Sequence, residues 1–184
     1  MILTKKEILK RKKDIVVKPF NINNVNANSI DLTLNPNMYV YNLDTQTELD
    51  AKLDNPIQHI VIPEEGYVLQ PNTLYIARTN EHTETLNHVP MLADKSSLAR
   101  LGLTTHANAG FGDNGFRGTW TLEMTTVHPL RIYPNMKICQ IYYQTVPKEY
   151  NNTIHKDNLY QGKYQDQVDA TTSRSWIDAH QNNL

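Results

Sequence analysis

Cysteine is almost absent from this sequence, and glycine is scarce. The single cysteine, Cys139, excludes an internal disulfide framework and every zinc or iron–sulfur site that needs several cysteines. Long apolar runs are missing as well, and none approaches the roughly 20 residues that a helix needs to cross a bilayer. With no disulfides and no recognisable signal peptide, the expected compartment is the cytoplasm, and a membrane is not an expected partner.

An excess of charge of either sign is also lacking. The 184 residues include 18 Lys and Arg against 19 Asp and Glu, which gives a formal charge of −1 at pH 7. A nearly neutral chain has no overall field that would hold a nucleic-acid polymer, so none is expected as a partner. An anionic ligand would have to be bound by a local cluster of basic residues. The length corresponds to one domain, or to one domain with a tail.

The apolar residues that follow residue 14 recur mostly with a period of two, which is typical of strands. Prolines separate the apolar segments, as turns require. The predicted strands cover residues 15–17, 29–34, 38–41, 60–62, 67–69, 74–77, 119–124 and 138–143. Many short strands with regular turns favour a β-sandwich or a β-barrel.

Two short helices are predicted beside these strands. Thr4 and Glu7 have the spacing of a capping box, which predicts an N-terminal helix of about ten residues. Residues 95–101 suit a second helix with a serine cap and with Leu98 and Leu101 facing inward. After Pro147 the chain becomes polar and has few apolar anchors. We therefore expect a β domain over residues 1–150 and a C-terminal tail over residues 151–184.

The serines of the central helix are the first candidate binding residues. Ser96 and Ser97 lie at a predicted helix N-terminus, and Arg100 follows four residues later. Free backbone N–H groups, two hydroxyls and a guanidinium together form a cradle suited to a phosphate. A Ser-Ser pair at this position also occurs as a simple helix cap, so the pattern alone leaves both interpretations open.

Two carboxylates near the glycine-rich segment are the second candidates. Residues 106–118 contain Asp113 and most of the glycines, and they lead into a strand that carries Glu123. With a period of two, Glu123 shares one strand face with Thr119 and Thr121. That face either meets solvent or lines a pocket, in which a carboxylate with a raised pKa would be suited to moving protons.

These segments together resemble the core motifs of the dCTP deaminases, which belong to the trimeric dUTPase superfamily. The resemblance extends over nearly the whole chain, in the same order and spacing, and it is weakest over residues 44–60. The segments that carry it are Asn28–Leu32, Ser96–Leu103, Ala109–Gly118, Thr121–Glu123, Gly162–Gln167 and Ser173–Arg174.

The resemblance implies a mainly β fold, a distorted jelly-roll β-barrel of the dUTPase-like type, with short N-terminal and central helices. It also implies a homotrimer with active sites between the subunits. By correspondence, Glu123 is the proton-shuttling glutamate, and Asp113 orders water and the sugar. The residues then expected to bind substrate are Lys95, Ser96, Ser97, Arg100, Ala109, Phe116, Thr121, Tyr160, Lys163 and Gln167.

Two expectations concern metals. Mg²⁺ would arrive bound to the nucleotide triphosphate and would need no carboxylate cage from the protein. Zinc is not expected, because the zinc deaminases need an H-x-E segment together with a P-C-x-x-C segment. His82-Thr83-Glu84 spells the first, but one cysteine cannot complete the second.

The expected function is zinc-independent hydrolytic deamination of dCTP to dUTP and ammonia. Glu123 would take a proton from water at cytosine C4 and return protons to N3 and to the leaving ammonia, with His106–Ala109 backbone groups steering the water. Three alternatives stay open: a bifunctional enzyme that forms dUMP and pyrophosphate, a plain dUTPase, and a non-catalytic deoxynucleotide sensor. The residues leave open whether the product is dUTP or dUMP and whether dTTP inhibits.

Overall fold

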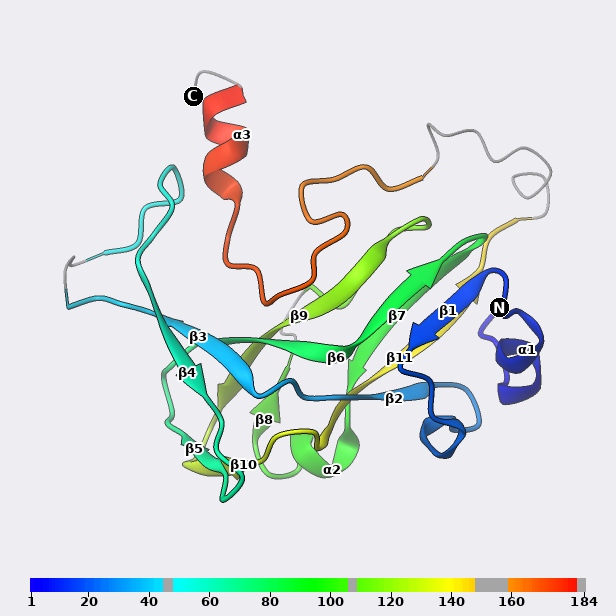
Figure 1. Ribbon diagram of the computed structural model, residues 1–184, viewed down its shortest axis with the longest axis horizontal. Coiled ribbons are helices and arrows are strands. Elements are labelled where there is room, and N and C mark those ends of the chain that lie inside the picture. The colour runs from blue at the N-terminus through cyan, green and yellow to red at the C-terminus, as the bar shows by residue number, and fades with distance from the viewer. Residues whose placement is uncertain (45–47, 106–108, 148–158, 182–184) are drawn as a thin grey trace.

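This computed structural model describes residues 1–44, 48–105, 109–147 and 159–181 (Figure 1). Strands make up most of the regular structure, which confirms the predicted mainly β fold with short N-terminal and central helices. The helices are α1 (Lys5–Lys10), a 3₁₀ turn η1 (Ile22–Asn24), α2 (Ser96–Ala99) and α3 (Ser175–Gln181). None of them has the length and apolar character that a bilayer-spanning helix requires.

Every predicted strand is present, although several have different ends. In chain order the strands are β1 (Ile15–Lys18), β2 (Ile30–Thr33), β3 (Asn37–Tyr41), β4 (Ile57–Val61), β5 (Tyr67–Leu69), β6 (Tyr75–Thr85), β7 (His88–Asp94), β8 (Leu103–Thr104), β9 (Arg117–Thr126), β10 (Leu130–Ile132) and β11 (Lys137–Thr145). The sequence did not predict β7, β8, β10 or the second half of β6. In that half the buried side chains are polar, at Thr79, Glu81, Thr83 and Thr85, so the hydrophobic pattern does not reveal it.

The described strands form separate hydrogen-bonded sheets that pack together and do not close into one continuous barrel (Figure 1). The largest has the order β4-β3-β6-β9-β8, and β1 pairs with the second half of β6. A second sheet has the order β2-β11-β7, and β5 pairs with β10. The long strands β6 and β9 therefore form the centre of the fold, and β9 is the strand that carries Glu123.

The core lies between the inner faces of these sheets. Leu32, Leu122, Met124 and Ile141 are fully buried in it. Burying a side chain of this size contributes roughly 1.5–3 kcal/mol relative to leaving it exposed. Cys139 lies in the same cluster, and burial raises the pKa of its thiol, so it is the apolar core residue that its place in an apolar strand indicates.

Both short helices differ in detail from their predictions. Thr4 is the N-cap of α1, but its side chain makes no capping hydrogen bond, and the helix has 6 residues. Glu7 instead pairs with Arg11, four residues later, which provides a stronger partner than a backbone N–H group. The N-cap of α2 is Lys95 rather than a serine, and Leu101 is 54% exposed instead of facing inward.

The C-terminal tail returns across the large sheet and runs beside β9 (Figure 1). Its backbone pairs with the strand, since Asp166 N donates to Arg117 O at 2.9 Å and Thr119 N donates to Gln167 O at 2.9 Å. The sheet therefore supplies the order that the polar composition of the tail cannot supply alone. The predicted boundary at residue 150 lies outside the described residues, so the two-part division stays a prediction.

Candidate functional site

A cavity of about 500 Å³ lies between the sheet centred on β6 and β9 and the C-terminal tail. Most of the predicted site residues line it. They are Ala109, Asp113, Phe116, Thr121, Glu123, Tyr160 and Gln167. Five of these residues belong to the segment 109–123, and Tyr160 and Gln167 belong to the tail. The cavity therefore forms because the tail crosses β9.

Strand pairing places Glu123 in this cavity. In the antiparallel ladder Glu123 lies opposite Ile76 of β6, and Ile76 in turn lies opposite Tyr39 of β3. Directly opposed residues in antiparallel strands present their side chains on the same face of the sheet. The face of β9 that carries Thr121 and Glu123 therefore faces the tail and the cavity, rather than open solvent.

Aromatic rings form one wall of the cavity. The ring centroids of Phe116 and Trp120 are 4.7 Å apart, and Tyr160 meets Phe116 edge-on at 5.8 Å. The Trp120 indole donates a hydrogen bond to Thr83 Oγ1 at 2.9 Å, which fixes the plane of the ring. A rigid apolar wall beside a few polar groups is the usual composition of a small-molecule site.

The glycines place the Asp113 turn against this wall. Gly112 N donates to Pro90 O at 2.9 Å, and a Cβ atom at Gly112 would collide with the Trp120 ring. Gly115 has a φ of 93°, which an L side chain rarely adopts. Gly112 is therefore explained by the close approach of the turn to the aromatic wall, and Gly115 by its backbone angle; the turn that they form brings Asp113 to the cavity.

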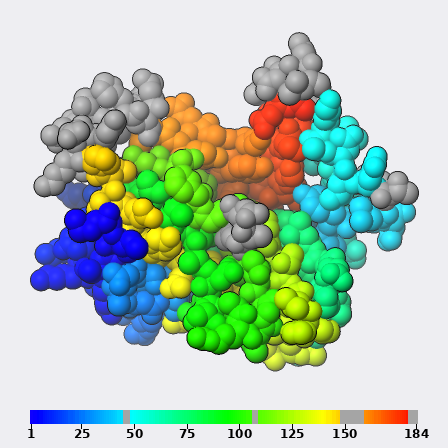
Figure 2. Space-filling model, turned by 180° about the vertical axis from the view of Figure 1, so that it is seen from behind, coloured from blue at the N-terminus to red at the C-terminus, as the bar shows by residue number. Residues whose placement is uncertain are grey.

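The predicted phosphate cradle lies elsewhere in this chain. None of Lys95, Ser96, Ser97 and Arg100 lines the cavity. Ser96 and Ser97 on α2, and Arg100 at its C-cap, are exposed. Figure 2 shows the face on which the segment that carries α2 (green) is at the lower edge and the tail (orange to red) at the upper edge. Within one chain, the structure therefore does not bring the predicted phosphate cradle to the cavity that Glu123 and Asp113 line.

The predicted tail residues hold the tail itself in place. Lys163 does not line the cavity, and its Nζ pairs with Asp178 of α3, whose hydrogen bond raises the pKa of Lys163. Gln167 Nε2 donates to Thr119 O at 2.7 Å, so Gln167 holds the tail as well as lining the cavity. Thr121 has a similar second contact, because its hydroxyl accepts from Thr171 N at 3.1 Å.

Some lining residues were not identified from the sequence. They are Tyr41, Leu74, Ile76, Phe111, Gly112, Trp120, Tyr164, Thr171, Thr172 and Ser173. Ser173 belongs to the Ser173–Arg174 segment that resembles the dCTP deaminases, so the resemblance could have identified it. Ile76 is supplied by β6, which pairs with β9, and Tyr41 by β3 on the far side of β6, so only the strand order identifies them.

The described residues hold no group of three or more His, Cys, Asp or Glu side chains that could bind a metal ion. His82 Nε2 lies 3.5 Å from Glu84 Oε1, and Lys18 Nζ pairs with the same carboxylate at 3.8 Å, so the H-x-E segment forms polar contacts on β6. His106, part of the backbone segment expected to steer the water, lies outside the described residues.

A buried carboxylate connects α2 to the core. Asp31 Oδ1 accepts from Lys95 Nζ at 2.8 Å, and Asp31 Oδ2 lies 3.0 Å from Lys137 Nζ. Burial alone would raise the pKa of Asp31, but hydrogen bonds from Lys95, Lys137 and Asn26 outweigh it and hold the pKa below its usual range. Lys95, expected beside the cradle, is thus engaged in fixing the start of α2.

Replacing Asp31 with asparagine is expected to lower the free energy of unfolding at pH 7 by about 2 kcal/mol, because two ammonium groups lose their buried partner. Since the pKa of Asp31 is lower in the folded than in the unfolded protein, its stabilisation is present above about pH 4 and disappears as the pH falls through the folded-state pKa. Urea unfolding at pH 7 and at pH 3 measures both effects. The exposed Asp54→Asn is the control, and wild-type stability of Asp31→Asn at pH 7 would contradict the assignment.

The sequence of this chain is similar to that of known proteins over most of its length. Residues 2–146 match the family model described as dCTP deaminase-like. A protein of Clostridium botulinum named dCTP deaminase, dUMP-forming, is 51% identical over 166 residues, covering 90% of this chain and 91% of the relative. Proteins with the same name from Hathewaya histolytica and Leptospira biflexa are 48% and 49% identical, over 94% and 88% of this chain and 96% and 90% of theirs.

A solved structure shares the fold. It is the crystal structure of 2′-deoxycytidine 5′-triphosphate deaminase from Agrobacterium tumefaciens, with a TM-score of 0.62 and 17% sequence identity. The match covers 79% of this chain, and this chain spans 48% of the length of the solved one. At that identity the likeness concerns the fold, and it agrees with the fold type that the motifs implied.

Proposed function

This chain belongs to the dCTP deaminase-like family, and we propose that it hydrolyses the exocyclic amine of dCTP in the cavity between β9 and the tail. The observation that carries this proposal is the position of Glu123 in the same cavity as Asp113, beside the aromatic wall of Phe116 and Trp120. This wall suits a pyrimidine and a deoxyribose, and the carboxylate can exchange protons with water held beside them.

In the proposed mechanism Glu123 acts first as a base and then as an acid. It removes a proton from a water molecule, and the resulting hydroxide oxygen adds to cytosine C4. Glu123 delivers that proton to N3, then takes the proton of the new C4 hydroxyl and passes it to the amine, so the C4–N4 bond breaks, the C4 carbonyl forms and ammonia leaves. One carboxylate thus serves both steps without a protein-bound metal, as two-role acid–base groups do in other hydrolases.

We propose further that the product is dUMP. The relatives at about half identity are named dUMP-forming, and Asp113 lines the same cavity as Glu123. A second water, with Asp113 as its base, would attack the α-phosphorus and expel pyrophosphate. The overall reaction then consumes dCTP and two waters and yields dUMP, ammonia and pyrophosphate. Under this proposal dUTP is an intermediate or a second substrate, and dTTP is a candidate inhibitor of the same cavity.

Mg²⁺ is proposed to enter with the triphosphate and to neutralise its charge. The described residues offer no cluster of ligands that would hold the ion independently of the nucleotide. Oxygen atoms of the phosphates and water are the ligands that Mg²⁺ prefers in such complexes. The single buried cysteine is compatible with a reducing compartment, and the cytoplasm remains our proposed location.

The separation of the cradle from the cavity supports a homotrimer with shared sites. Ser96 and Ser97 on α2 and Arg100 at its C-cap are exposed, while Glu123 and Asp113 line the cavity beside the tail. A triphosphate whose base lies in the cavity of one chain would then extend to the α2 cradle of a neighbouring chain. Cyclic assembly repeats that contact at each interface.

Mixed oligomers test this arrangement. Glu123→Gln and Arg100→Ala are each expected to be nearly inactive alone. In co-expressed mixed oligomers, about a quarter of the sites combine an intact Glu123 from one chain with an intact Arg100 from its neighbour, so about a quarter of the wild-type activity is expected to return. Activity of tandem-tagged mixed oligomers and their mass by light scattering provide the readout. A co-expressed Glu123→Gln and Glu123→Ala pair, with both lesions at one position of the cavity, is the matched control. Its activity is expected to stay low, and a Glu123→Gln and Arg100→Ala mixture no more active than this control would contradict shared sites.

Product analysis separates the candidate functions. After incubation with dCTP and Mg²⁺, loss of the cytosine absorbance and release of ammonia show deamination. Binding of dCTP by calorimetry without any ammonia would instead indicate a deoxynucleotide sensor. Turnover of dUTP with intact dCTP would indicate a plain dUTPase.

A further inference from the structure

The tail contacts the sheet through every second residue from Gln167 to Ser173. Gln167 pairs with the backbone of Thr119, and Thr171 N donates to Thr121 Oγ1 at 3.1 Å. Ser173 N donates to the hydroxyl of Tyr41 at 3.1 Å. We call residues 167–173 the strap. Gln167, Thr171, Thr172 and Ser173 also line the cavity, so the strap is one of its walls.

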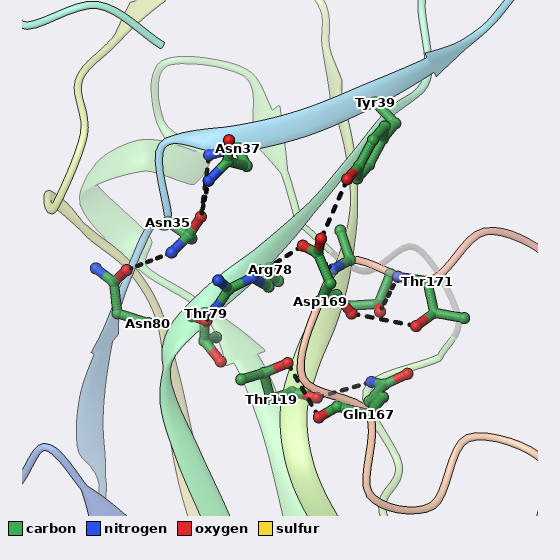
Figure 3. A network of polar contacts seen from close by, with 12 residues as sticks. Asn35, Asn37, Tyr39, Arg78, Thr79, Asn80, Thr119, Gln167, Asp169 and Thr171 are labelled. Atoms are coloured by element: carbon green, nitrogen blue, oxygen red, sulfur yellow. Dashed lines mark hydrogen bonds and ion pairs between the residues drawn. The ribbon is translucent and has the colours of Figure 1, made fainter. Parts of the chain in front are cut away.

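Asp169, at the centre of the strap, makes the ionic contact in this series. Its Oδ1 accepts from Arg78 Nε at 3.1 Å, and its Oδ2 accepts from the Tyr39 hydroxyl at 3.1 Å. Figure 3 shows Arg78 and Tyr39 pointing toward Asp169 from two strands. These strands are the paired β6 and β3. Burial and the neighbouring carboxylate raise the pKa of Tyr39, so its hydroxyl stays protonated and donates.

Burial and a second hydrogen bond hold Arg78 in position for its ion pair with Asp169. Only 18% of its side chain is exposed, and its Nη1 donates to Thr79 O at 3.1 Å, which limits the freedom of the guanidinium. Arg78 also lies directly opposite Thr121 across the β6–β9 ladder. Its side chain is therefore on the same face of the sheet as Thr121 and Glu123, and it fixes the strap over the strand that carries the proposed proton shuttle.

We propose that Arg78 is a positioning residue for dCTP, and that the Arg78–Asp169–Tyr39 contact is a latch that holds the strap as a wall of the cavity. The role in substrate binding rests on the proposed function, whereas the latch itself does not. Neither Arg78 nor Asp169 lines the cavity, so they act through the strap residues on either side of Asp169.

The chain contains a matched control for this latch. Arg117 Nη2 and Asp166 Oδ2 are 2.8 Å apart and also connect β9 to the tail. Their side chains are 51% and 58% exposed, and neither residue lines the cavity. Asp169 is 54% exposed, so the two pairs differ in the arginine, which is mostly buried in the latch and exposed in the control. A pair with both side chains exposed contributes little to stability, so its removal tests the effect of losing a tail charge alone.

The test compares Asp169→Asn with Asp166→Asn. Hydrogen exchange of the nucleotide-free protein is expected to show about tenfold weaker protection of the Thr171 and Ser173 amides in Asp169→Asn, because a charge-assisted contact is lost. Protection in Asp166→Asn is expected to match the wild type. Tyr39→Phe removes one hydroxyl and is expected to weaken protection by about threefold. Arg78→Lys should lie between Arg78→Ala and the wild type, since lysine keeps the charge but loses the planar fork.

Kinetics then test the positioning role. With dCTP, Asp169→Asn is expected to raise KM by about threefold or more with kcat nearly unchanged, because the strap must be closed for binding. Wild-type protection at Thr171 and Ser173 in Asp169→Asn would overturn the latch. Reduced protection with an unchanged KM would overturn the positioning role. A wild-type protein that does not turn over dCTP would refute the proposed function while leaving the exchange result intact.

Discussion

Replacing Glu123 with glutamine is expected to lower the rate of dCTP deamination by at least about 100-fold, and by up to about 10,000-fold, which is the usual contribution of a general acid–base group. Glutamine has nearly the same size and retains a carbonyl oxygen, but it cannot take a proton from water and return it to the leaving amine. Because the aromatic wall and the strap are untouched, dCTP binding by calorimetry is expected to be retained.

The matched control is Glu84→Gln. Glu84 lies on β6, opposite Arg117, and does not line the cavity. Its replacement removes one carboxylate from the same sheet and is expected to leave the rate unchanged. A Glu123→Gln variant that keeps a tenth of the wild-type rate would remove Glu123 from the mechanism.

The second large effect concerns Asp113. Asp113→Asn is expected to reduce pyrophosphate release to below about 1% of the wild-type rate, because the water that attacks the α-phosphorus loses its base. Deamination is expected to continue, since Glu123 is intact, and dUTP should accumulate in place of dUMP. ³¹P NMR of the reaction with dCTP and Mg²⁺ distinguishes free pyrophosphate from an intact triphosphate.

The wild-type reaction provides the reference for that variant. Pyrophosphate that appears in step with ammonia would support the bifunctional enzyme, and accumulation of dUTP by the wild type would leave deamination alone. Unimpaired pyrophosphate release in Asp113→Asn would show that another group activates the second water.

The sequence predicted the parts of the fold in which apolar residues alternate. Leu122 and Met124 mark β9, and Cys139 and Ile141 mark β11, because each strand presents these apolar side chains to the core. The second half of β6 was missed for the opposite reason. Its buried residues are polar, and two of them have partners in distant segments: Thr33 N donates to Glu81 Oε2 at 2.8 Å, and Trp120 Nε1 donates to Thr83 Oγ1 at 2.9 Å. No local pattern encodes such a partner.

In the candidate site, too, residues in contiguous motifs were predicted, whereas residues that pair across distant segments were not. The Asp113 turn and Glu123 belong to contiguous motifs, so a short sequence window was sufficient to find them. Arg78 and Asp169 are 91 residues apart, and each looks like an ordinary surface charge in isolation. Their pairing follows from the β3-β6-β9 strand order together with the path of the tail.

The burial of Cys139 makes the protein a convenient subject for site-directed labelling. Its thiol lies at 0% exposure within the core strand β11, and its raised pKa keeps the reactive thiolate scarce in the folded protein. Thiol reagents should therefore react with the native protein only when the core opens, and the labelling rate reports global unfolding. A cysteine introduced at exposed Val168 in the strap could then carry a fluorophore without background, so that strap movement is read directly.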